Sequence, residues 1–518
     1  MQRTNKMAVK VYSAQVVGIK ANIIEVEVDL SQGLHSFSVV GLPDKAVEES
    51  KDRISAAIKN SGLVSPQKKN QKVTISLAPA DLKKEGPVFD LAIALAYLLA
   101  SKQISFDVTD KIFLGELALD GKIRPIKGTL VLMRHAQKKG FKEVFLPSEN
   151  AREAALIKGI KIFGCGSLKE IISHFNTKED FNLSEQPETE IAFNEKQEEV
   201  SFDFSDIKGQ ESAKRGLEIA AAGGHNVLMV GPAGTGKTML AKAFAAILPP
   251  LSFDEILETT LIHSVAGVLQ EDFLSKRPFR SPHHTSSYVA LVGGGTYPRP
   301  GEITLGHRGV LFLDEFPEFE RRVIESLRQP LEDGVVNISR AKESLTFPAR
   351  FILVCAMNPC PCGNLNSKTK PCICSQGSLM RYERKISGPI LDRIDLWLEV
   401  PQVEHEKLSD EKISGESSKA IQERVIKARK IQKKRFSEKD GGKSPILTNA
   451  EMSVRELKQF ALLSEGVRNI LNQAAKRLDL SGRAYHRVIK LARTIADLEG
   501  EEQIKEPHIL EALQYRPK

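Results

Sequence analysis

The chain has 518 residues, which is too long for a single hydrophobic core and predicts two or three domains. Hydrophobic residues make up 41% and charged residues 27%, as in ordinary globular proteins, and the net charge of +8 permits nucleic-acid binding without requiring it. The first 15 residues lack the apolar segment of a signal peptide, and the longest apolar run, residues 88–100, is too short to span a bilayer. We therefore expect a cytoplasmic protein without membrane contact.

Residues 1–175 alternate short strand and helix patterns and predict one α+β domain. Residues 23–30 alternate with the period of a half-buried strand, residues 43–60 have helical spacing, and residues 73–77 predict another strand. Residues 90–100 form an apolar helical run, and residues 115–126 predict a hairpin that turns at Asp120 and Gly121.

A change of composition separates this domain from the rest. Residues 176–200 contain eight acidic and two basic residues, so we interpret 176–201 as a solvated acidic linker. Residues 202–400 then return to an α/β pattern, with strands predicted at 226–230, 310–313 and 351–356. Residues 401–518 are predicted to be helical, and we expect an α/β fold overall.

One helix of this last region is strongly basic. Residues 419–435 carry eight basic residues and one acidic residue, with Ile421, Val425, Ala428 and Ile431 along one predicted face. A helix with a solvated basic face is the favoured interpretation, and contacts with phosphate groups are the alternative.

Residues 231–238 read GPAGTGKT and match the phosphate-binding pattern G-x-x-x-x-G-K-[ST]. A predicted strand precedes the motif and a helix follows it, which makes a chance Gly-rich turn a poor alternative. Lys237 is expected to reach the β- and γ-phosphates of ATP, and Thr238 to bind Mg²⁺. The predicted nucleotide-binding residues are Gly231, Pro232, Ala233, Gly234, Thr235, Gly236, Lys237 and Thr238.

The segment LFLDEF, residues 311–316, predicts a buried strand that ends in two carboxylates. We expect Asp314 to hold Mg²⁺ through water and Glu315 to polarise the attacking water. Asn358, at the end of the next predicted strand, is expected to position the same water. Arg393 follows later, where one subunit would insert it into the site of its neighbour. Taken alone, a capping Asn and a surface Arg would be the ordinary interpretation of these two residues.

Four cysteines form the pattern C-x-C-x₉-C-x-C at Cys360, Cys362, Cys372 and Cys374. Four thiolates suit a tetrahedral structural Zn²⁺, with four reduced thiols in a loop as the alternative. His283 and His284 lie in a polar, Gly-rich segment, and we assign them no catalytic role.

Several long blocks now identify a resemblance: RSPHHTSSYVALVGGG, PRPGEITLGHRGVLFLDEFPEF, AMNPCPCGN and ISGPILDRIDL. With VGLPDKAVEESKDRISAAIKNSG and RAYHRVIKLARTIADLEG, the chain resembles the YifB/ComM family of magnesium-chelatase-like AAA+ proteins over nearly its full length. The resemblance implies a P-loop AAA+ core with a helical C-terminal lid. It further implies a homo-hexameric ATPase motor acting on branched or single-stranded DNA, a branch-migration helicase in recombination or natural transformation.

The same resemblance implies two further features. A hairpin over residues 334–347 would bring Arg340 and Lys342 to DNA phosphates, with a solvated hairpin tip as the alternative. In the lid, Arg483 would touch the γ-phosphate, and Arg487 is the alternative one turn later. A protein-remodelling or chelatase-like ATPase without a DNA substrate is the alternative function.

The N-terminal domain resembles the Lon protease fold through GELALDGKIRPIKG and AQKKGFKEVFLP. Lon proteases use a serine as nucleophile and a lysine as base. The aligned positions hold Val88 and Leu130, which can neither attack a carbonyl nor transfer a proton. We therefore expect a scaffold or DNA-contacting domain without peptidase activity.

Overall fold

The computed structural model describes residues 9–176, 180–189, 202–295, 299–339, 344–365, 370–403, 415–437 and 446–517. The chain forms two compact units, which are described separately below. Unit 1 comprises residues 1–192 together with 253–274, and unit 2 comprises residues 193–252 together with 275–518. In the described ranges, no helix combines the length and the apolar character needed to cross a membrane.

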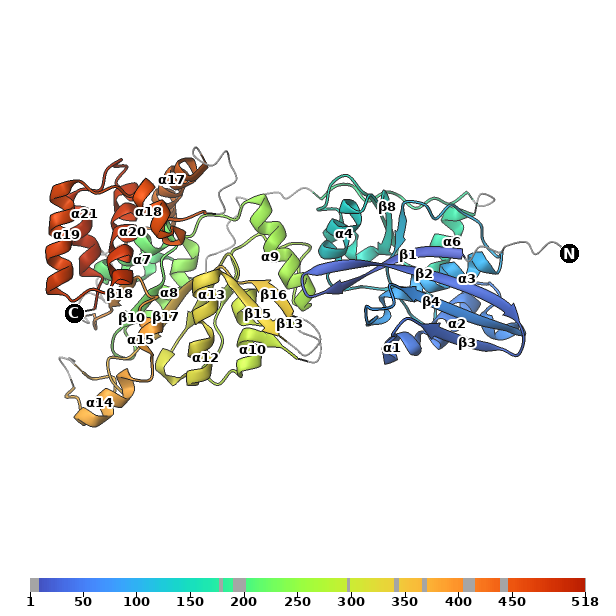
Figure 1. Cartoon of the computed structure of the whole chain (residues 1–518), viewed down its shortest axis with the longest axis horizontal. Coiled ribbons are helices and arrows are strands. Elements are labelled where there is room, and N and C mark those ends of the chain that lie inside the picture. Colours follow the sequence, from blue (N-terminus) through green and yellow to red (C-terminus); the bar gives the residue numbers. More distant parts are fainter. Residues whose placement is uncertain are drawn as a thin grey trace. The chain divides into compact units, whose positions relative to one another are not determined.

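Unit 1 contains a four-stranded sheet of order β1-β2-β4-β3, in which only β3 and β4 are parallel (Figure 1). Alternating apolar side chains of β2 and β4, including Val26, Val28, Val73 and Ile75, are buried on one face. The elements are β1 (Val9–Val17), β2 (Lys20–Gln32), β3 (Ser36–Val40), β4 (Gln71–Ala78), α1 (Lys45–Glu48), α2 (Ser50–Asn60) and α3 (Asp90–Ala100).

Helix α3 forms the centre of this core, because the side chains from Asp90 to Leu98 are buried on every face. It contacts β1, β2 and α2, so an apolar helix of this length is explained without a membrane. The buried Asp90 accepts hydrogen bonds from Arg53 at 2.8 and 3.2 Å, which compensates the carboxylate at the start of the helix.

A second layer of unit 1 has a parallel sheet of order β5-β8-β9 and a small hairpin of β6 and β7. The hairpin confirms the predicted turn, since Asp120 and Gly121 lie between its strands. The elements are β5 (Lys111–Phe113), β6 (Glu116–Leu117), β7 (Ile123–Arg124), β8 (Glu143–Pro147), β9 (Lys161–Cys165), α4 (Thr129–Lys138), α5 (Ala151–Ala154) and α6 (Leu168–Phe175).

Residues 180–189 differ from the expected solvated linker. Gln186 N–H donates to the Ile162 carbonyl at 2.8 Å, Thr189 N–H donates to Ala155 at 3.1 Å, and Leu183 packs against the apolar core of unit 1. The acidic composition did not predict this packing, which depends on one apolar side chain and on the free backbone groups of an edge strand. The flanking residues 177–179 and 190–201 lie outside the described residues.

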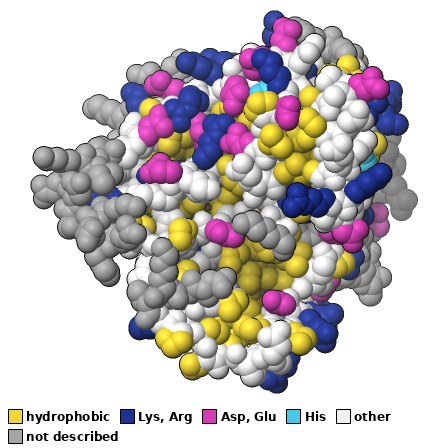
Figure 2. Space-filling model, turned by 90° about the vertical axis from the view of Figure 1, so that its left-hand side faces the viewer, with side chains coloured by type: hydrophobic (Ala, Val, Ile, Leu, Met, Phe, Trp, Pro, Cys, Tyr) yellow, Lys and Arg dark blue, Asp and Glu magenta, His cyan; other side chains and the backbone are white. Residues whose placement is uncertain are grey.

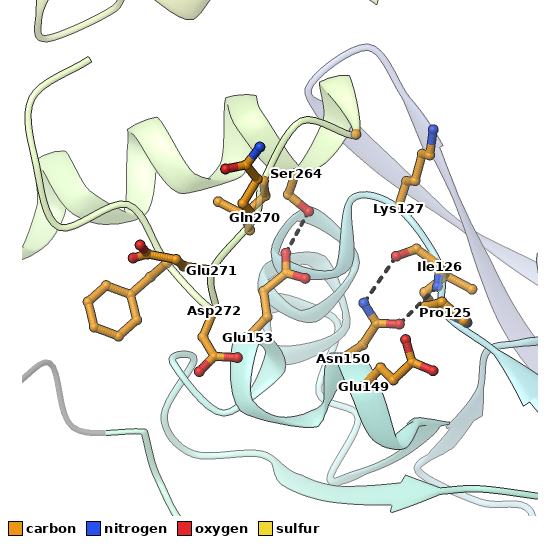
Figure 3. A pocket seen from close by; sticks show the side chains of 13 residues that line it. Pro125, Ile126, Lys127, Glu149, Asn150, Glu153, Ser264, Gln270, Glu271 and Asp272 are labelled. Carbon is orange, nitrogen blue, oxygen red and sulfur yellow. Dashed lines mark hydrogen bonds between the residues drawn. The ribbon is translucent and has the colours of Figure 1, made fainter. Parts of the chain in front are cut away.

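Unit 1 also contains α9 (Phe253–Ala266), although the expected core spanned residues 202–400 without interruption. The helix contacts α4 and borders a cavity of about 720 Å³ (Figure 3). Ser264 joins three elements there. Its hydroxyl donates to Glu153 of α5 at 2.5 Å and accepts from the Gly128 N–H at the start of α4 at 3.0 Å. Ser264 and Glu153 are buried, and this burial raises the pKa of Glu153.

Replacing Ser264 with alanine is expected to destabilise unit 1 by about 1–3 kcal/mol. The change leaves the Gly128 N–H without its partner and removes a donor from the buried Glu153 carboxyl. Hydrogen–deuterium exchange over α4 and α9 measures the effect, which should appear as faster exchange in both helices.

The matched control is Gln270→Ala, which alters an exposed side chain at the rim of the same cavity. If both variants exchange like the wild-type chain, Ser264 does not hold α9 to unit 1.

Unit 2 contains a five-stranded parallel sheet of order β11-β14-β17-β10-β18 (Figure 1). Three of these strands confirm the predicted ones within two residues at each end. The strands are β10 (Val227–Val230), β11 (Phe279–Arg280), β14 (Val310–Leu313), β17 (Ile352–Met357) and β18 (Leu396–Glu399).

Both faces of this sheet are covered, which explains the continuous apolar runs of its strands. In β14, Val310 and Phe312 belong to one apolar cluster with α7 and α8, whereas Leu311 and Leu313 belong to a second cluster with α12. The core helices and hairpin strands are α7 (Glu211–Gly223), α8 (Lys237–Ala246), α10 (Tyr288–Val292), β12 (Gly293–Gly294), β13 (Arg299–Pro300), α11 (Glu302–Leu305), α12 (Arg321–Ser326), α13 (Arg328–Asp333), β15 (Val335–Ser339), β16 (Ser344–Pro348), α14 (Gln376–Glu383) and α15 (Gly388–Leu391).

The C-terminal region is helical, as predicted, and packs on α7 through α17 and α20. The basic helix α17 turns a slightly different face to the core than expected. Gln432 is buried and donates to the Ala222 carbonyl at 3.0 Å, whereas Ile431 is 38% exposed. The helices are α17 (Ser418–Ser437), α18 (Val454–Phe460), α19 (Glu465–Arg477), α20 (Gly482–Leu498) and α21 (Glu506–Gln514).

Candidate active site

Three neighbouring parallel strands end at the same edge of the unit 2 sheet, and each is followed by predicted site residues. Val230 of β10 pairs with Met357 of β17, and Leu313 of β14 pairs with Cys355. The chain continues from these ends into Gly231, Asp314 and Asn358 respectively. Ligands of parallel α/β sheets bind beyond the carboxyl ends of the strands, so the topology brings these segments into one site.

The loop between β10 and α8 has the backbone of a phosphate cradle. Gly231 must be glycine, because a Cβ atom there would lie 2.1 Å from the Val400 carbonyl oxygen. Gly234 and Gly236 adopt φ values of +76° and +87°, which favour glycine. Gly236 also caps α8, whose N-terminus carries a partial positive charge suited to a phosphate anion.

Lys237 is buried at the start of α8 and points back into this loop. Its ammonium group donates to the carbonyls of Gly231 and Pro232 at 2.7 Å and to the Asn358 side-chain oxygen at 3.2 Å. Burial lowers the pKa of Lys237, and the nearby Asp314 opposes that shift. Lys237 and Asn358, which are 121 residues apart in the chain, are therefore in direct contact.

Thr238 and Asp314 also come together, because the threonine hydroxyl donates to an Asp314 carboxylate oxygen at 2.8 Å. A hydroxyl and a carboxylate at a phosphate loop are the oxygen ligands that Mg²⁺ takes in P-loop proteins. The other Asp314 oxygen accepts the Glu315 N–H at 2.9 Å, which fixes the turn that projects Glu315.

Glu315 has a partner that the sequence did not reveal. His284 Nδ1 lies 3.0 Å from Glu315 Oε2, and its ring lies 4.1 Å from that of His283. His284 follows β11, which neighbours β14 in the sheet, so it emerges at the same edge as Glu315. His284 therefore lies close enough to help orient the carboxylate. The sequence could have predicted this contact only if residues 279–280 had been recognised as a parallel strand beside β14.

Arg393 and Arg483 do not join this group. The Arg393 carbonyl accepts a hydrogen bond from the Asn226 side chain, and Asn226 comes just before β10. Arg393 therefore lies at the amino ends of the strands. That edge is about 13 Å from the phosphate loop, because β10 is four residues long. The Arg393 guanidinium is buried and pairs with Glu332. Arg483 lies 3.5 Å from the other oxygen of Glu332 and is 60% exposed.

The alternative lid residue, Arg487, forms an ion pair with the buried Asp395. Burial alone would raise the pKa of Asp395, but Arg487 and His225 outweigh it and hold that pKa well below its usual range. Asp395 also accepts the Asn226 N–H at 3.1 Å. Arg487 therefore joins the lid helix to the core, and Arg483 is the freer of the two arginines.

The hairpin predicted at residues 334–347 is confirmed as β15 and β16, which pair antiparallel from Val335 and Pro348 to Ser339 and Ser344. Its tip, residues 340–343, lies outside the described residues, and with it the predicted DNA-contacting Arg340 and Lys342.

The four predicted metal-ligand cysteines converge, with their sulfur atoms all within 4.8 Å of one another. Three Sγ–Sγ distances are 3.4, 3.8 and 3.6 Å, among Cys360, Cys362 and Cys372. Zn–S bonds of about 2.3 Å in a tetrahedral site place sulfur atoms about 3.8 Å apart. Backbone N–H groups of Asn364 and Ile373 lower the pKa of Cys362, whereas burial and neighbouring thiols raise the pKa of Cys372 and Cys374. The geometry therefore fits a Zn²⁺ site.

The cysteine loop also approaches the phosphate loop. Cys360 is two residues beyond Asn358, and a Cβ atom on Gly363 would lie 3.9 Å from the Ala233 nitrogen. The Tyr382 hydroxyl of α14 donates to the Asn358 carbonyl at 3.1 Å. The side chain of Asn358 therefore contacts Lys237, and its backbone carbonyl accepts a hydrogen bond from Tyr382.

In unit 1, Val88 and Leu130, the two positions where the resemblance would place a Lon-type dyad, are apolar and partly or fully buried. Leu130 of α4 is 1% exposed, and Val88 packs against the core of the unit. Neither side chain offers a nucleophile or a base.

Comparison with known proteins places the chain in a family. Family profiles described as magnesium chelatase, subunit ChlI, match residues 203–408 and 26–150, and a profile of the ChlI C-terminal region matches residues 415–516. The competence protein ComM of Haemophilus influenzae is 43% identical over 511 residues, which cover 98% of this chain and 97% of the relative.

Two other relatives show further similarity. The protein YifB of Salmonella typhimurium is 42% identical over 509 residues, or 98% of this chain and 96% of the relative. The magnesium-chelatase 38 kDa subunit of Cereibacter sphaeroides is 29% identical over 177 residues, or 30% of this chain and 53% of that protein. The chain therefore belongs to the YifB/ComM family of magnesium-chelatase-like AAA+ proteins.

Proposed function

We propose that this protein is an ATP-hydrolysing motor that acts on DNA, with branch migration as the expected activity. The observation that carries the ATPase assignment is the contact of Lys237 with Asn358 and of Thr238 with Asp314 at one edge of a parallel sheet. ATP and Mg²⁺ are the cofactors that these residues fit. Lys237 and the loop N–H groups bind the phosphates, Thr238 and Asp314 hold Mg²⁺, and Glu315 and Asn358 orient the attacking water.

The DNA assignment rests on the hairpin and on the relatives. The hairpin of β15 and β16 lies where the family resemblance places a pore loop, and the ComM relative is named a competence protein. Three basic side chains of α17 contribute less to DNA binding than its composition indicated, because they bind within the chain. Arg424 pairs with Glu218, Arg429 donates to the Ala221 carbonyl, and Arg435 pairs with Asp497.

A homo-hexamer is the assembly that the site favours. Arg393 lies at the sheet edge opposite to its own phosphate loop, so it can serve only the site of a neighbouring subunit. Figure 2 shows one face of the molecule on which apolar side chains gather in a hollow below a region of mixed charge. In unit 2, exposed apolar side chains such as Leu462 and Leu510 provide surface that a subunit contact would cover.

We also propose a structural Zn²⁺ at the four cysteines, with no open position for a substrate. Protein purified without chelators is expected to contain about one Zn²⁺ per chain, measured by elemental analysis. Cys372→Ser should lose the metal and lower ATP hydrolysis about tenfold, because the cysteine loop supports Asn358.

The control is Ile373→Ser, which changes an 84% exposed side chain between two of the cysteines. Metal-free wild-type protein would overturn the zinc assignment.

The proposed function is tested by ATP hydrolysis with and without forked or four-way-junction DNA, at two salt concentrations, with Lys237→Ala as the inactive control. Stimulation by DNA that weakens steeply with salt, followed by movement of the junction, is the expected result. Hydrolysis that is indifferent to every DNA would favour the alternative, a protein-remodelling or chelatase-like ATPase. For unit 1, which has apolar side chains at the dyad positions, no peptidase activity is expected.

A further inference from the structure

One carboxylate, Glu332, holds both arginines that are absent from the phosphate site. One of its oxygens pairs with the Arg393 guanidinium, and the other lies 3.5 Å from Arg483. Arg393 also donates to the Pro389 carbonyl at 2.7 Å. The three side chains come from α13, from the segment after α15, and from the first turn of α20. The core and the lid therefore meet at Glu332.

In this arrangement Arg393 cannot reach a phosphate. Its side chain is only 6% exposed, and its donors are directed at Glu332 and Pro389. A guanidinium that stabilises a γ-phosphate must first exchange this carboxylate for the phosphate. Arg393 lowers the pKa of Glu332, so the carboxylate remains charged and keeps its hold at neutral pH.

Helix α13 itself gives only a weak reason for a negative charge at this position, since Arg328 lies one turn before Glu332. Glu332 lies in the last turn of the helix, where the helix dipole disfavours an anion. The pairing with Arg393 and Arg483 offsets that unfavourable contribution, and Arg393 lowers the pKa of Glu332 the most.

Glu332 is also joined closely to the DNA-contacting hairpin proposed above. Asp333 ends α13, Gly334 turns the chain with φ +67°, and β15 begins at Val335. The Ala349 N–H donates to the Gly334 carbonyl at 2.8 Å and closes the base of the hairpin. Only Asp333 and Gly334 separate Glu332 from the first strand of the hairpin, so the hairpin and the Glu332 contact are close in the chain.

We propose that Glu332 is a positioning residue that withholds Arg393 from the neighbouring subunit's ATP, and Arg483 from the γ-phosphate, until the hairpin moves. DNA bound at the hairpin shifts the end of α13, breaks the two ion pairs, and frees both arginines together. This inference rests on the proposed function and adds the step by which DNA would control hydrolysis.

The test is the rate of ATP hydrolysis by assembled full-length protein, as kcat and KM, with and without four-way-junction DNA. Glu332→Gln keeps the size of the side chain but removes the charge that pairs with the arginines. Its basal kcat is expected to rise about fivefold, as for loss of a partly exposed ion pair, and its stimulation by DNA to fall by the same factor. Glu332→Asp, which retains the charge, should restore part of the wild-type stimulation.

Asp333→Asn is the matched control, because it makes the same chemical change one residue nearer the hairpin at an exposed side chain. It should behave like the wild-type protein. The increase in Glu332→Gln should vanish when Arg393→Ala is added, since the two residues act through one contact.

A basal kcat that is unchanged or lower in a folded Glu332→Gln protein overturns the inference. If DNA fails to stimulate the wild-type protein, the DNA function fails, while a raised basal kcat in Glu332→Gln would still support the restraint itself. DNA stimulation of the wild-type protein therefore tests the DNA function, and the basal kcat of Glu332→Gln tests the restraint.

Discussion

Replacing Glu315 with glutamine is expected to lower ATP hydrolysis about a thousandfold while ATP binding persists. The amide cannot polarise the attacking water as a carboxylate does, whereas the phosphate loop and the Thr238–Asp314 pair remain intact. Steady-state hydrolysis and binding of a fluorescent ATP analogue measure the two effects separately. The expected pattern is a loss of kcat with nearly unchanged nucleotide affinity.

Two controls frame this result. Lys237→Ala should lose binding as well as hydrolysis, because it removes a cation that lies inside the phosphate loop. Glu318→Gln changes a carboxylate three residues after Glu315 that pairs with Lys385 at the surface, and it should retain activity. A Glu315→Gln protein that hydrolyses ATP within tenfold of wild type would remove Glu315 from the catalytic role.

The central residues of the site were predictable because they are local to strand ends. Motif order along the chain indicated that Gly231, Asp314 and Asn358 follow strands, and parallel pairing alone brings strand ends to one edge. The four cysteines were predictable for a related reason, since fifteen residues of loop allow four thiols to meet.

The remaining contacts depend on tertiary structure that no local pattern contains. His284 reaches Glu315 only because β11 lies beside β14, and the two strands are 29 residues apart. Glu332 finds Arg393 and Arg483 across 61 and 151 residues of chain. Pairs of this kind leave no periodic signal, because each partner alone has the appearance of an ordinary surface charge.

Two helices show why local patterns mislead. In α17, the apolar side chain of Ile431 suggested its burial, but the helix instead buries Gln432, whose amide satisfies the Ala222 carbonyl and the Asn449 N–H. A hydrogen-bonded amide at the correct helical spacing replaced an apolar residue one position away. Helix α9 lies between two elements of unit 2 in sequence yet belongs to unit 1, because Ser264 finds buried partners there.

The two lid arginines are expected to separate by their effects on stability and catalysis. Arg487→Ala should lower the free energy of unfolding of unit 2 by about 3 kcal/mol, because it leaves the buried Asp395 without its cation. This loss of stability is at the lower end of the range for a broken buried ion pair, because Asp395 still accepts the Asn226 N–H. Arg483→Ala should change stability by less than about 0.5 kcal/mol, because its side chain is 60% exposed. It should instead reduce ATP hydrolysis at least about tenfold.

Denaturation followed by the fluorescence of Trp397, the single tryptophan of the chain and a neighbour of Asp395 in sequence, measures the difference. The effect of Arg487→Ala also depends on pH in a direction that the ion pair fixes. The depressed pKa of Asp395 stabilises the folded chain above the unfolded value of about 4, and this contribution is lost as the pH falls below it. The stability gap between wild type and Arg487→Ala should therefore be widest at neutral pH and narrow under acid conditions. A gap that is constant from pH 7 to pH 3, or a larger loss in Arg483→Ala, would reverse the roles assigned to the two arginines.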